Sequence, residues 1–262
     1  MSAPQLPQSE WQFQWEHYYD DSEHLFWQWI YPNTVETFRG KTVIDAGCGG
    51  GQHLNLVAPY AAAVTGLDLN TAAIARRHTA QRSNVTVLTG DIAVIALTPM
   101  DVVYCIGVIQ HTLDPDRTFQ NLKRLVKPGG RLILWCYSRE GNWPNRLVLE
   151  PFKKLFLLRL PKPVLNAVAL VLTLCLYPVV YTVYLLPLRW LTYHQYFKNW
   201  RQLSFRRNQL NVFDKLNAPL THFIPRAQVA GWFNSADFTN VHLDHYQGVS
   251  WRASGTRRSP VE

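Results

Sequence analysis

The most constraining feature of this chain is a glycine-rich turn that follows a short apolar run. Residues 42–46 are Thr-Val-Ile-Asp-Ala, and Gly47, Gly49 and Gly51 then come at every second position before helix-compatible sequence. Glycine is needed where the backbone turns sharply and a ligand approaches so closely that a Cβ atom would clash. A strand, a glycine turn and a helix in this order predict a nucleotide-like ligand at the carboxyl ends of parallel strands.

The spacing of the glycines separates two kinds of cofactor. A dinucleotide-binding turn reads Gly-x-Gly-x-x-Gly, and counting from Gly47 puts its third glycine at Gln52. The chain instead has Asp45-x-Gly47-x-Gly49-x-Gly51, which resembles motif I of the class I S-adenosylmethionine (SAM)-dependent methyltransferases. A carboxylate at Asp45 suits the cationic amino-acid end of SAM. A glycine-rich turn without a ligand is the structural alternative.

Later segments extend the resemblance in the order of the family. The apolar run 63–67 ends at Asp68, 21 residues after Gly47, where a carboxylate accepts hydrogen bonds from a ribose diol. Alternatively, Asp68 only caps the helix that follows. A third run, 85–88, leads to Asp91, which the resemblance places at the amino group of adenine.

The remaining strands complete the predicted sheet. Residues 101–107 form a nearly continuous apolar run, as expected of a strand buried on both faces. Residues 131–137 follow a Lys-Pro-Gly-Gly turn that is also typical of the family, 226–235 read as a helix, and 238–256 read as a strand and its hairpin partner. We expect an α/β, Rossmann-like class I methyltransferase fold, with a seven-stranded, mostly parallel sheet and a helical insertion between strand five and the last helix.

Four parts follow from this assignment: an aromatic helical cover (1–39), the SAM-binding core (40–138), a basic hydrophobic insertion (139–225), and a final helix with the last strands (226–262). Residues 1–9 are expected to be disordered. Nine aromatic residues between positions 11 and 31 indicate either a helix packed on the core or a cover over the SAM site, with Tyr18 or Tyr19 at the cofactor. The candidate cofactor-binding residues are Asp45, Gly47, Cys48, Gly49, Gly51, Asp68, Leu69, Asp91, Ile92, Ile106, Gly107 and Tyr19.

All of the basic excess lies in the insertion. Twelve Lys and Arg residues against three acidic residues give it a net charge of +9, whereas the whole chain carries +8. Ala167–Leu188 is an uncharged, mostly apolar run of 22 residues, long enough to span a bilayer. A simple span conflicts with the topology, because both ends of the insertion connect to one sheet. Pro178 predicts a break into two short helices.

Three interpretations of the insertion differ in what covers the apolar run. It forms a buried lid, or it binds nucleic acid, or it dips into one leaflet with cations on anionic head groups. Nucleic acid is disfavoured because an apolar segment is a poor neighbour for phosphates. We favour monotopic membrane contact, because a buried lid does not explain the flanking cations, which are Lys153, Lys154, Arg159, Lys162, Arg189, Lys198 and Arg201. Since residues 1–25 lack the apolar segment of a secretory signal, we expect a cytoplasmic protein, peripheral on the inner face of a membrane.

The expected chemistry is an in-line displacement, which needs alignment and, for a hydroxyl acceptor, a base. His111 follows strand four and is the candidate base, although it can instead order the loop or contact the cofactor. Asp214 and His222 resemble a substrate-facing segment of related enzymes. They orient the acceptor or act as a dyad, or else they form a turn cap and a packed histidine. Some quinone-pathway relatives carry a Glu-His pair here that binds a metal. In this chain Gln110 precedes His111, so we predict no metal.

We predict a SAM-dependent methyltransferase that methylates oxygen or carbon of a small, apolar or lipid-linked acceptor. One alternative is a soluble methyltransferase of a sugar or secondary metabolite, in which the apolar run is buried. A second alternative is a SAM-binding or membrane-interaction module without catalysis. The oligomeric state stays open.

Overall fold

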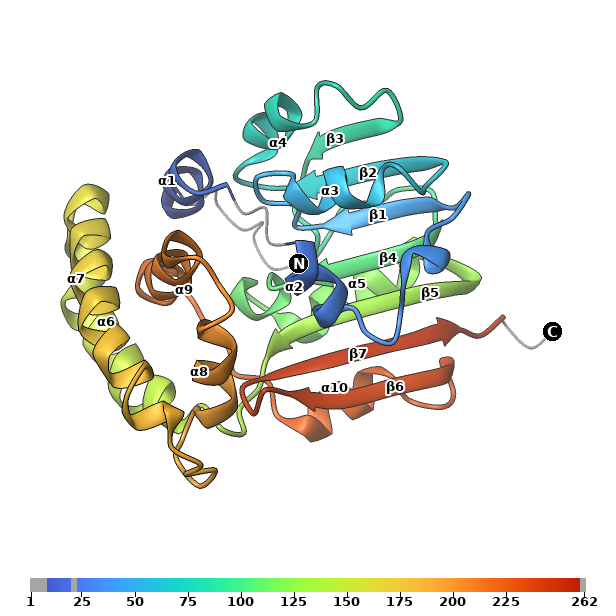
Figure 1. The fold of residues 1–262 in the computed structure, drawn as a ribbon. Helices are drawn as coiled ribbons and strands as arrows, with labels where there is room; N and C mark the ends of the chain where they lie inside the picture. The colour runs from blue at the N-terminus through green and yellow to red at the C-terminus, as the bar shows by residue number, and fades with distance from the viewer. Residues whose placement is uncertain (1–8, 20–22, 260–262) are drawn as a thin grey trace.

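A seven-stranded sheet forms the centre of the computed structural model, which describes residues 9–19 and 23–259 (Figure 1). The disorder expected for residues 1–9 lies outside this range except at Ser9. The strands are β1 Thr42–Ala46, β2 Ala63–Asp68, β3 Val85–Thr89, β4 Met100–Ile106, β5 Val126–Tyr137, β6 Phe238–Tyr246 and β7 Ser250–Arg257. Their order is β3-β2-β1-β4-β5-β7-β6, with β7 antiparallel to both neighbours and β1 to β5 parallel. The predicted Rossmann-like methyltransferase fold is confirmed.

Alternation along the strands gives the sheet two buried faces. Val43 and Tyr104 contribute to one apolar cluster, whereas their neighbours Ile44 and Val103 contribute to the other, because successive side chains of a strand point to opposite faces. Helices α2 and α3 cover the first face, and α5 and α10 cover the second (Figure 1). The flanking helices are α2 Glu23–Trp29, α3 Gln52–Val57, α4 Ala72–His78, α5 Pro115–Leu125 and α10 Arg226–Trp232.

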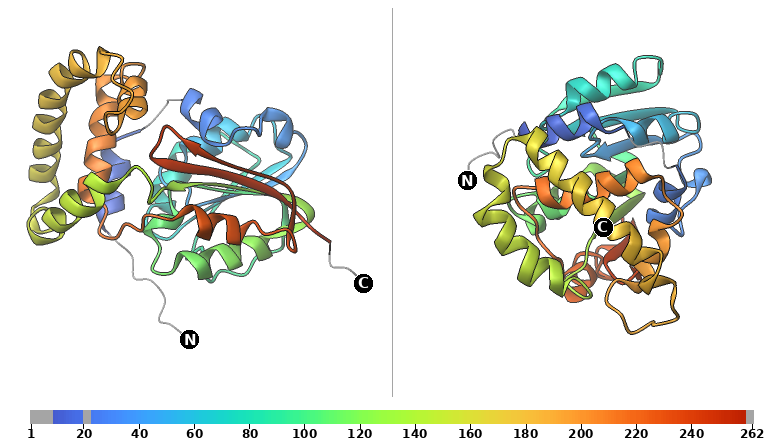
Figure 2. Two further views of the ribbon diagram at one scale, coloured as in Figure 1. Left: turned by 90° about the horizontal axis from the view of Figure 1, so that it is seen from below. Right: turned by 60° about the vertical axis from the view of Figure 1, so that its left-hand side comes forward.

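The insertion and the first helix stand together beyond the carboxyl ends of the parallel strands (Figures 1 and 2). These elements are α1 Ser9–His17, α6 Glu150–Leu155, α7 Lys162–Val180, α8 His194–Trp200 and α9 Phe205–Asn217. Helix α7 is outermost and packs on α9, and the two share a third apolar cluster that is separate from those of the sheet. The insertion therefore has its own small core and faces the edge of the sheet where ligands bind in such folds.

Two expectations about the insertion were wrong. Helix α7 is continuous through Pro178, because the proline lies in the last turn and ends the helix instead of splitting it. Three of the seven cations assigned to head groups turn inward: Lys153 is fully buried beside Glu150, Lys162 pairs with Glu10 at 3.3 Å, and Arg201 donates to a backbone carbonyl at 2.8 Å. The four that remain exposed are Lys154, Arg159, Arg189 and Lys198.

Candidate functional site

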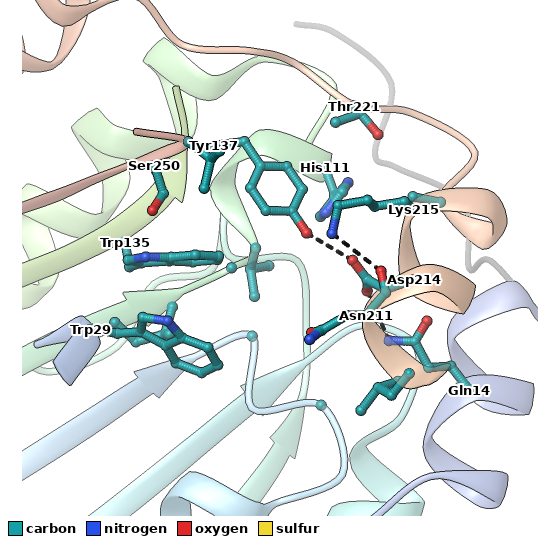
Figure 3. A pocket seen from close by; sticks show the side chains of 18 of the residues that line it. Gln14, Trp29, His111, Trp135, Tyr137, Asn211, Asp214, Lys215, Thr221 and Ser250 are labelled. Atoms are coloured by element: carbon teal, nitrogen blue, oxygen red, sulfur yellow. Dashed lines mark hydrogen bonds between the residues drawn. The ribbon is translucent and has the colours of Figure 1, made fainter. Parts of the chain in front are cut away.

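A cavity of about 430 Å³ lies between the carboxyl ends of the strands, the insertion and α1. Its lining comes from the glycine turn, from the loops after β2, β3 and β4, and from α1, α7, α8 and α9. Figure 3 shows side chains from the core and from the insertion pointing toward one another across it. A ligand in this cavity would contact parts of the chain that are far apart in the sequence.

The glycine turn presents bare backbone to this cavity. Gly47 and Gly49 line it, with φ of 89° and 55°, the left-handed region that favours glycine. A Cβ atom at Gly49 would lie 2.9 Å from the ring of Trp15, and one at Gly47 would lie 2.5 Å from Val108. Helix α1 thus lies directly over the turn. Gly51 stands outside the lining, and a Cβ there would approach the backbone of α4 to 3.2 Å, so this glycine serves packing.

Asp68 joins the glycine turn to the loop after β2. Its Oδ1 accepts hydrogen bonds from the backbone N–H groups of Asn70 and Thr71 at 2.7 and 2.8 Å, and its Oδ2 accepts from that of Gly49 at 3.0 Å. Burial raises the pKa of Asp68, while these backbone donors favour its charged form. A carboxylate offers about four acceptor positions. The capping role and the ribose role that we left open are therefore compatible.

The other candidate cofactor residues in the lining combine carboxylates with apolar side chains. Asp91 Oδ1 accepts from the N–H of Ala93 at 2.8 Å, which holds the carboxylate at the end of β3. The lining also includes Cys48, Leu69, Ile92, Ile106 and Gly107. Polar acceptors for hydroxyl and amino groups beside an apolar surface for a flat ring suit the nucleoside part of SAM. The residues present fit this cofactor.

Besides Gly51, two of the candidate cofactor residues lie outside the lining. Asp45 is buried behind the turn and outside the lining, and burial raises its pKa. Tyr19 is 45% exposed on the outer side of α3 and α4. Its hydroxyl accepts from the Asn55 amide at 3.3 Å, and its ring meets that of His78 edge-on at 5.0 Å. We correct the expectation for Tyr19, because its side chain packs on α3 and α4 outside the cavity lining. Trp15 is the aromatic residue that lies against the turn.

His111 has the geometry of a neutral proton acceptor. Its Nδ1 lies 2.7 Å from the carbonyl oxygen of Leu220. A carbonyl only accepts, so Nδ1 carries the proton and Nε2 keeps the lone pair. Burial lowers the pKa of His111, although the charge of Asp214 opposes this shift. The imidazole lines the cavity between the rings of Trp11, at 5.0 Å, and Tyr137, at 5.9 Å.

Asp214 is held by partners from two other parts of the chain (Figure 3). Its Oδ2 accepts from the hydroxyl of Tyr137 at 2.9 Å, and its Oδ1 accepts from the amide of Gln14 at 3.0 Å. Burial raises the pKa of Tyr137, so this hydroxyl stays a donor. His222 lies outside the lining, with its backbone N–H on the carbonyl of Gln110 at 2.7 Å. Within the described residues no hydrogen bond joins Asp214 to His222, and the expected dyad is corrected to Asp214 with Tyr137.

Several residues in or beside the cavity were missed by sequence reasoning. Tyr137 ends β5, and an aromatic hydroxyl at the carboxyl end of a parallel strand was a usable signal. The pattern held no such signal for Gln14 or for the buried pair of Lys153 and Glu150, in which Lys153 also donates to the Thr221 hydroxyl at 3.3 Å. Their positions depend on how α1 and the insertion fold back over the sheet.

Fold and site together define a Rossmann-like domain with a ligand cavity at the strand ends, and comparison with known proteins relates its core to methyltransferases. A model of the methyltransferase domain matches residues 44–134. The ubiquinone biosynthesis O-methyltransferase of Coxiella burnetii is 34% identical over 108 residues, which cover 39% of this chain and 46% of that protein. The chain thus matches about half the length of such relatives. These matches to its core support a class I SAM-dependent methyltransferase family, whose members use SAM.

Solved structures extend the likeness beyond the core at the level of fold. A chain in the complex of the Haloferax volcanii Trm112 methyltransferase activator with a methyltransferase superposes with a TM-score of 0.58 at 14% identity, covering 96% of both chains. An O-methyltransferase family protein from Burkholderia thailandensis gives 0.55 at 15% identity, covering 92% of this chain and 57% of that one. At these identities the match concerns the fold alone.

Proposed function

We propose that this protein transfers the methyl group of SAM to a hydroxyl group of a small amphipathic acceptor. The observation that carries the proposal is His111, whose Nδ1–H is held by the Leu220 carbonyl so that Nε2 is the acceptor. It lines the same cavity as the glycine turn. A neutral imidazole in this position is suited to take the proton of an acceptor hydroxyl.

Different residues of the chain would act on SAM and on the acceptor. Gly47, Gly49, Asp68 and Asp91 would hold SAM, which supplies a methyl group on a positively charged sulfur. His111 Nε2 takes the hydroxyl proton as the new oxygen–carbon bond forms and the carbon–sulfur bond breaks, with the electron pair passing to sulfur. The chain has to align these groups and exclude water.

The two ends of the acceptor region differ in polarity. Near His111 the lining is polar, with Tyr137, Asp214 and Asn211, whereas toward α7 and α8 it is apolar. The apolar lining includes Leu172, Leu176, Phe197, Trp200, Leu203 and Leu210. An acceptor with a hydroxyl-bearing head and an apolar body matches this division. Relatives named for ubiquinone biosynthesis, whose cores are similar, support the same class of acceptor.

The proposal is tested by following the label of methyl-labelled SAM. Purified protein is incubated with labelled SAM and a whole extract of the source organism, and the mixture is then divided between organic and aqueous phases. A parallel reaction uses His111→Gln, which keeps the size and polarity of the side chain but removes the base. SAM affinity of both proteins is measured by calorimetry, so that loss of transfer is separated from loss of binding.

Label in the organic phase with the wild type, and its loss with His111→Gln at unchanged SAM affinity, is the expected result. Label confined to the aqueous phase would overturn the amphipathic acceptor in favour of a sugar or a soluble metabolite. SAM binding without transfer to either phase would overturn catalysis and leave a SAM-binding module.

A further inference from the structure

Helix α7 carries an apolar side that the protein leaves uncovered. Only 22% of its most apolar 18-residue stretch is buried, whereas the core helix of a soluble protein is mostly buried. Leu165, Ala169 and Thr173 face α9 and are buried, while Val171 and Leu174 are 57% and 55% exposed. The exposed residues recur at helical spacing, so they form one side of the helix. Exposed apolar areas of this kind mark interaction surfaces.

The exposed apolar side continues onto the neighbouring elements. We call it the apolar face and define it by Phe152, Phe156, Val171, Leu174, Leu185 and Trp190. Helix α6 and the segment after α7 belong to the same outer layer as α7, as both views of Figure 2 show. This layer lies on the far side of α9 from the sheet, at the edge of the molecule.

The exposed charges on the elements that carry the apolar face are positive. Lys154, Arg159, Arg189 and Lys198 are exposed on or beside its elements. Two of the three acidic residues of the insertion, Glu150 and Asp214, line the cavity instead of the surface. Exposed aromatic and aliphatic side chains flanked by cations are the pattern of helices that lie in the interface of an anionic membrane.

The cavity extends to helix α7, which carries this face. Leu172 lines the cavity and is also 41% exposed, and Leu176, one turn further along α7, lines it as well. The apolar end of the acceptor region therefore lies at the exposed helix α7, whereas His111, at the polar end, is only 7% exposed.

We propose that the apolar face docks on the surface of an anionic bilayer, and that the apolar body of the acceptor enters the cavity from the lipid past Leu172. Helix α7 lies in the plane of the membrane and does not cross it, because both ends of the insertion join one sheet, at β5 and at α10. The entry route rests on the proposed acceptor class, whereas the docking stands independently of it. Charge complementarity favours a bilayer over a second copy of the chain, since two such faces would bring like charges together.

The test is vesicle flotation with the full chain. Vesicles of phosphatidylcholine alone are compared with vesicles of phosphatidylcholine and phosphatidylglycerol in equal amounts. The first variant is Val171→Asp with Leu174→Asp, at two exposed positions outside the cavity lining. The matched control is Val241→Asp on β6, 43% exposed and far from the insertion. The second variant, Lys154→Glu with Arg159→Glu, changes only charge.

We expect the wild type to float with the anionic vesicles. The double Asp variant should lose more than about tenfold in partitioning, because the burial of a single Val or Leu side chain already contributes about tenfold or more. The charge variant should lose at least about fivefold for each cation, and high salt should have a similar effect. Val241→Asp should float like the wild type, and all variants should keep SAM affinity.

Failure of the wild type to float with either vesicle, or equal flotation of the double Asp variant, would overturn the proposal. Light scattering coupled to gel filtration tests whether a second copy of the chain covers the face instead. If the wild type is a dimer, and the double Asp variant is a monomer with unaltered flotation, a second copy covers the face. Label transfer to a detergent-dispersed extract is measured in parallel. If label transfer persists in the double Asp variant while flotation is lost, the apolar face serves docking and not catalysis. The two measurements therefore distinguish a failure of docking from a failure of the proposed function.

Discussion

The two halves of the cavity are built in different ways. The cofactor half comes from strand ends that follow one another along the core, with Gly47, Asp68 and Asp91 each directly after or near the end of a parallel strand. The acceptor half brings together α1, the end of β5 and an insertion that is distant in sequence, as the hydrogen bonds of Asp214 to Gln14 and Tyr137 show. A cofactor site of this kind is encoded locally, whereas the acceptor site exists only after separate segments have packed together.

The strongest test of this division is His111→Gln. Removing the base should lower kcat by roughly a hundredfold to ten-thousandfold, while SAM affinity stays unchanged. His222→Gln is the matched control, because His222 lies outside the lining and should retain near wild-type kcat. Equal losses in both variants would show that the histidines act through the structure of the loop, and the division would fail.

The pH profile sharpens the assignment to His111. The base acts in its neutral form, so the rate should be constant at neutral pH and fall as the pH drops through the pKa of His111. Because burial lowers that pKa, the fall should come below the ordinary histidine value of about 6.5. The measurement is kcat against pH at saturating SAM. A fall centred above that value would argue for another group.

Asp68→Ala should break the cofactor half alone. The acceptor position that the three backbone N–H groups leave open to a ribose hydroxyl is lost, so SAM affinity measured by calorimetry should fall by about tenfold to a hundredfold. Three backbone N–H groups also lose their acceptor, which should lower the melting temperature without abolishing cooperative unfolding. Unchanged affinity would leave Asp68 with only its capping role.

Tyr137→Phe should affect the acceptor half alone. The Asp214 carboxylate loses one donor, and we expect a loss of about tenfold in kcat/KM for the acceptor at constant SAM affinity. Asp214→Asn should give a loss of similar size. A parallel drop in SAM binding in either variant would contradict the separation of the two halves.

The smallest expected effect is that of Tyr19→Phe. The hydroxyl contacts Asn55 on the outer surface, so the change in SAM binding free energy should stay within about 0.5 kcal/mol. Calorimetry of this variant beside Asp68→Ala tests whether the cofactor half extends to α1 through this tyrosine. A clear loss of affinity would restore the role expected from the sequence.

The core could be predicted because its signals are local. Each of the strands β1 to β4 is a mainly apolar run of contiguous residues that either ends in an acidic residue or is followed directly by glycine, so Asp68 and Asp91 could be found by position alone. In the insertion, adjacent residues have opposite environments: Lys153 is buried with Glu150, whereas Lys154 is exposed. Composition treats the two lysines alike, and only tertiary packing separates them. The same holds for Trp15 and Tyr19, which share one aromatic segment but face opposite sides.

Because of the hydrogen bond between His111 and the carbonyl of Leu220, the tautomer of the candidate base depends on the position of the insertion. His111 belongs to the core, but Leu220 lies on the stretch that returns from α9 to α10, so its carbonyl is in place only when the insertion is seated. A displaced insertion would leave the imidazole free to exchange tautomers, and a site still loaded with cofactor would lack a correctly oriented base. In such an arrangement, the segment that contacts the acceptor also fixes the tautomer of the histidine that deprotonates it.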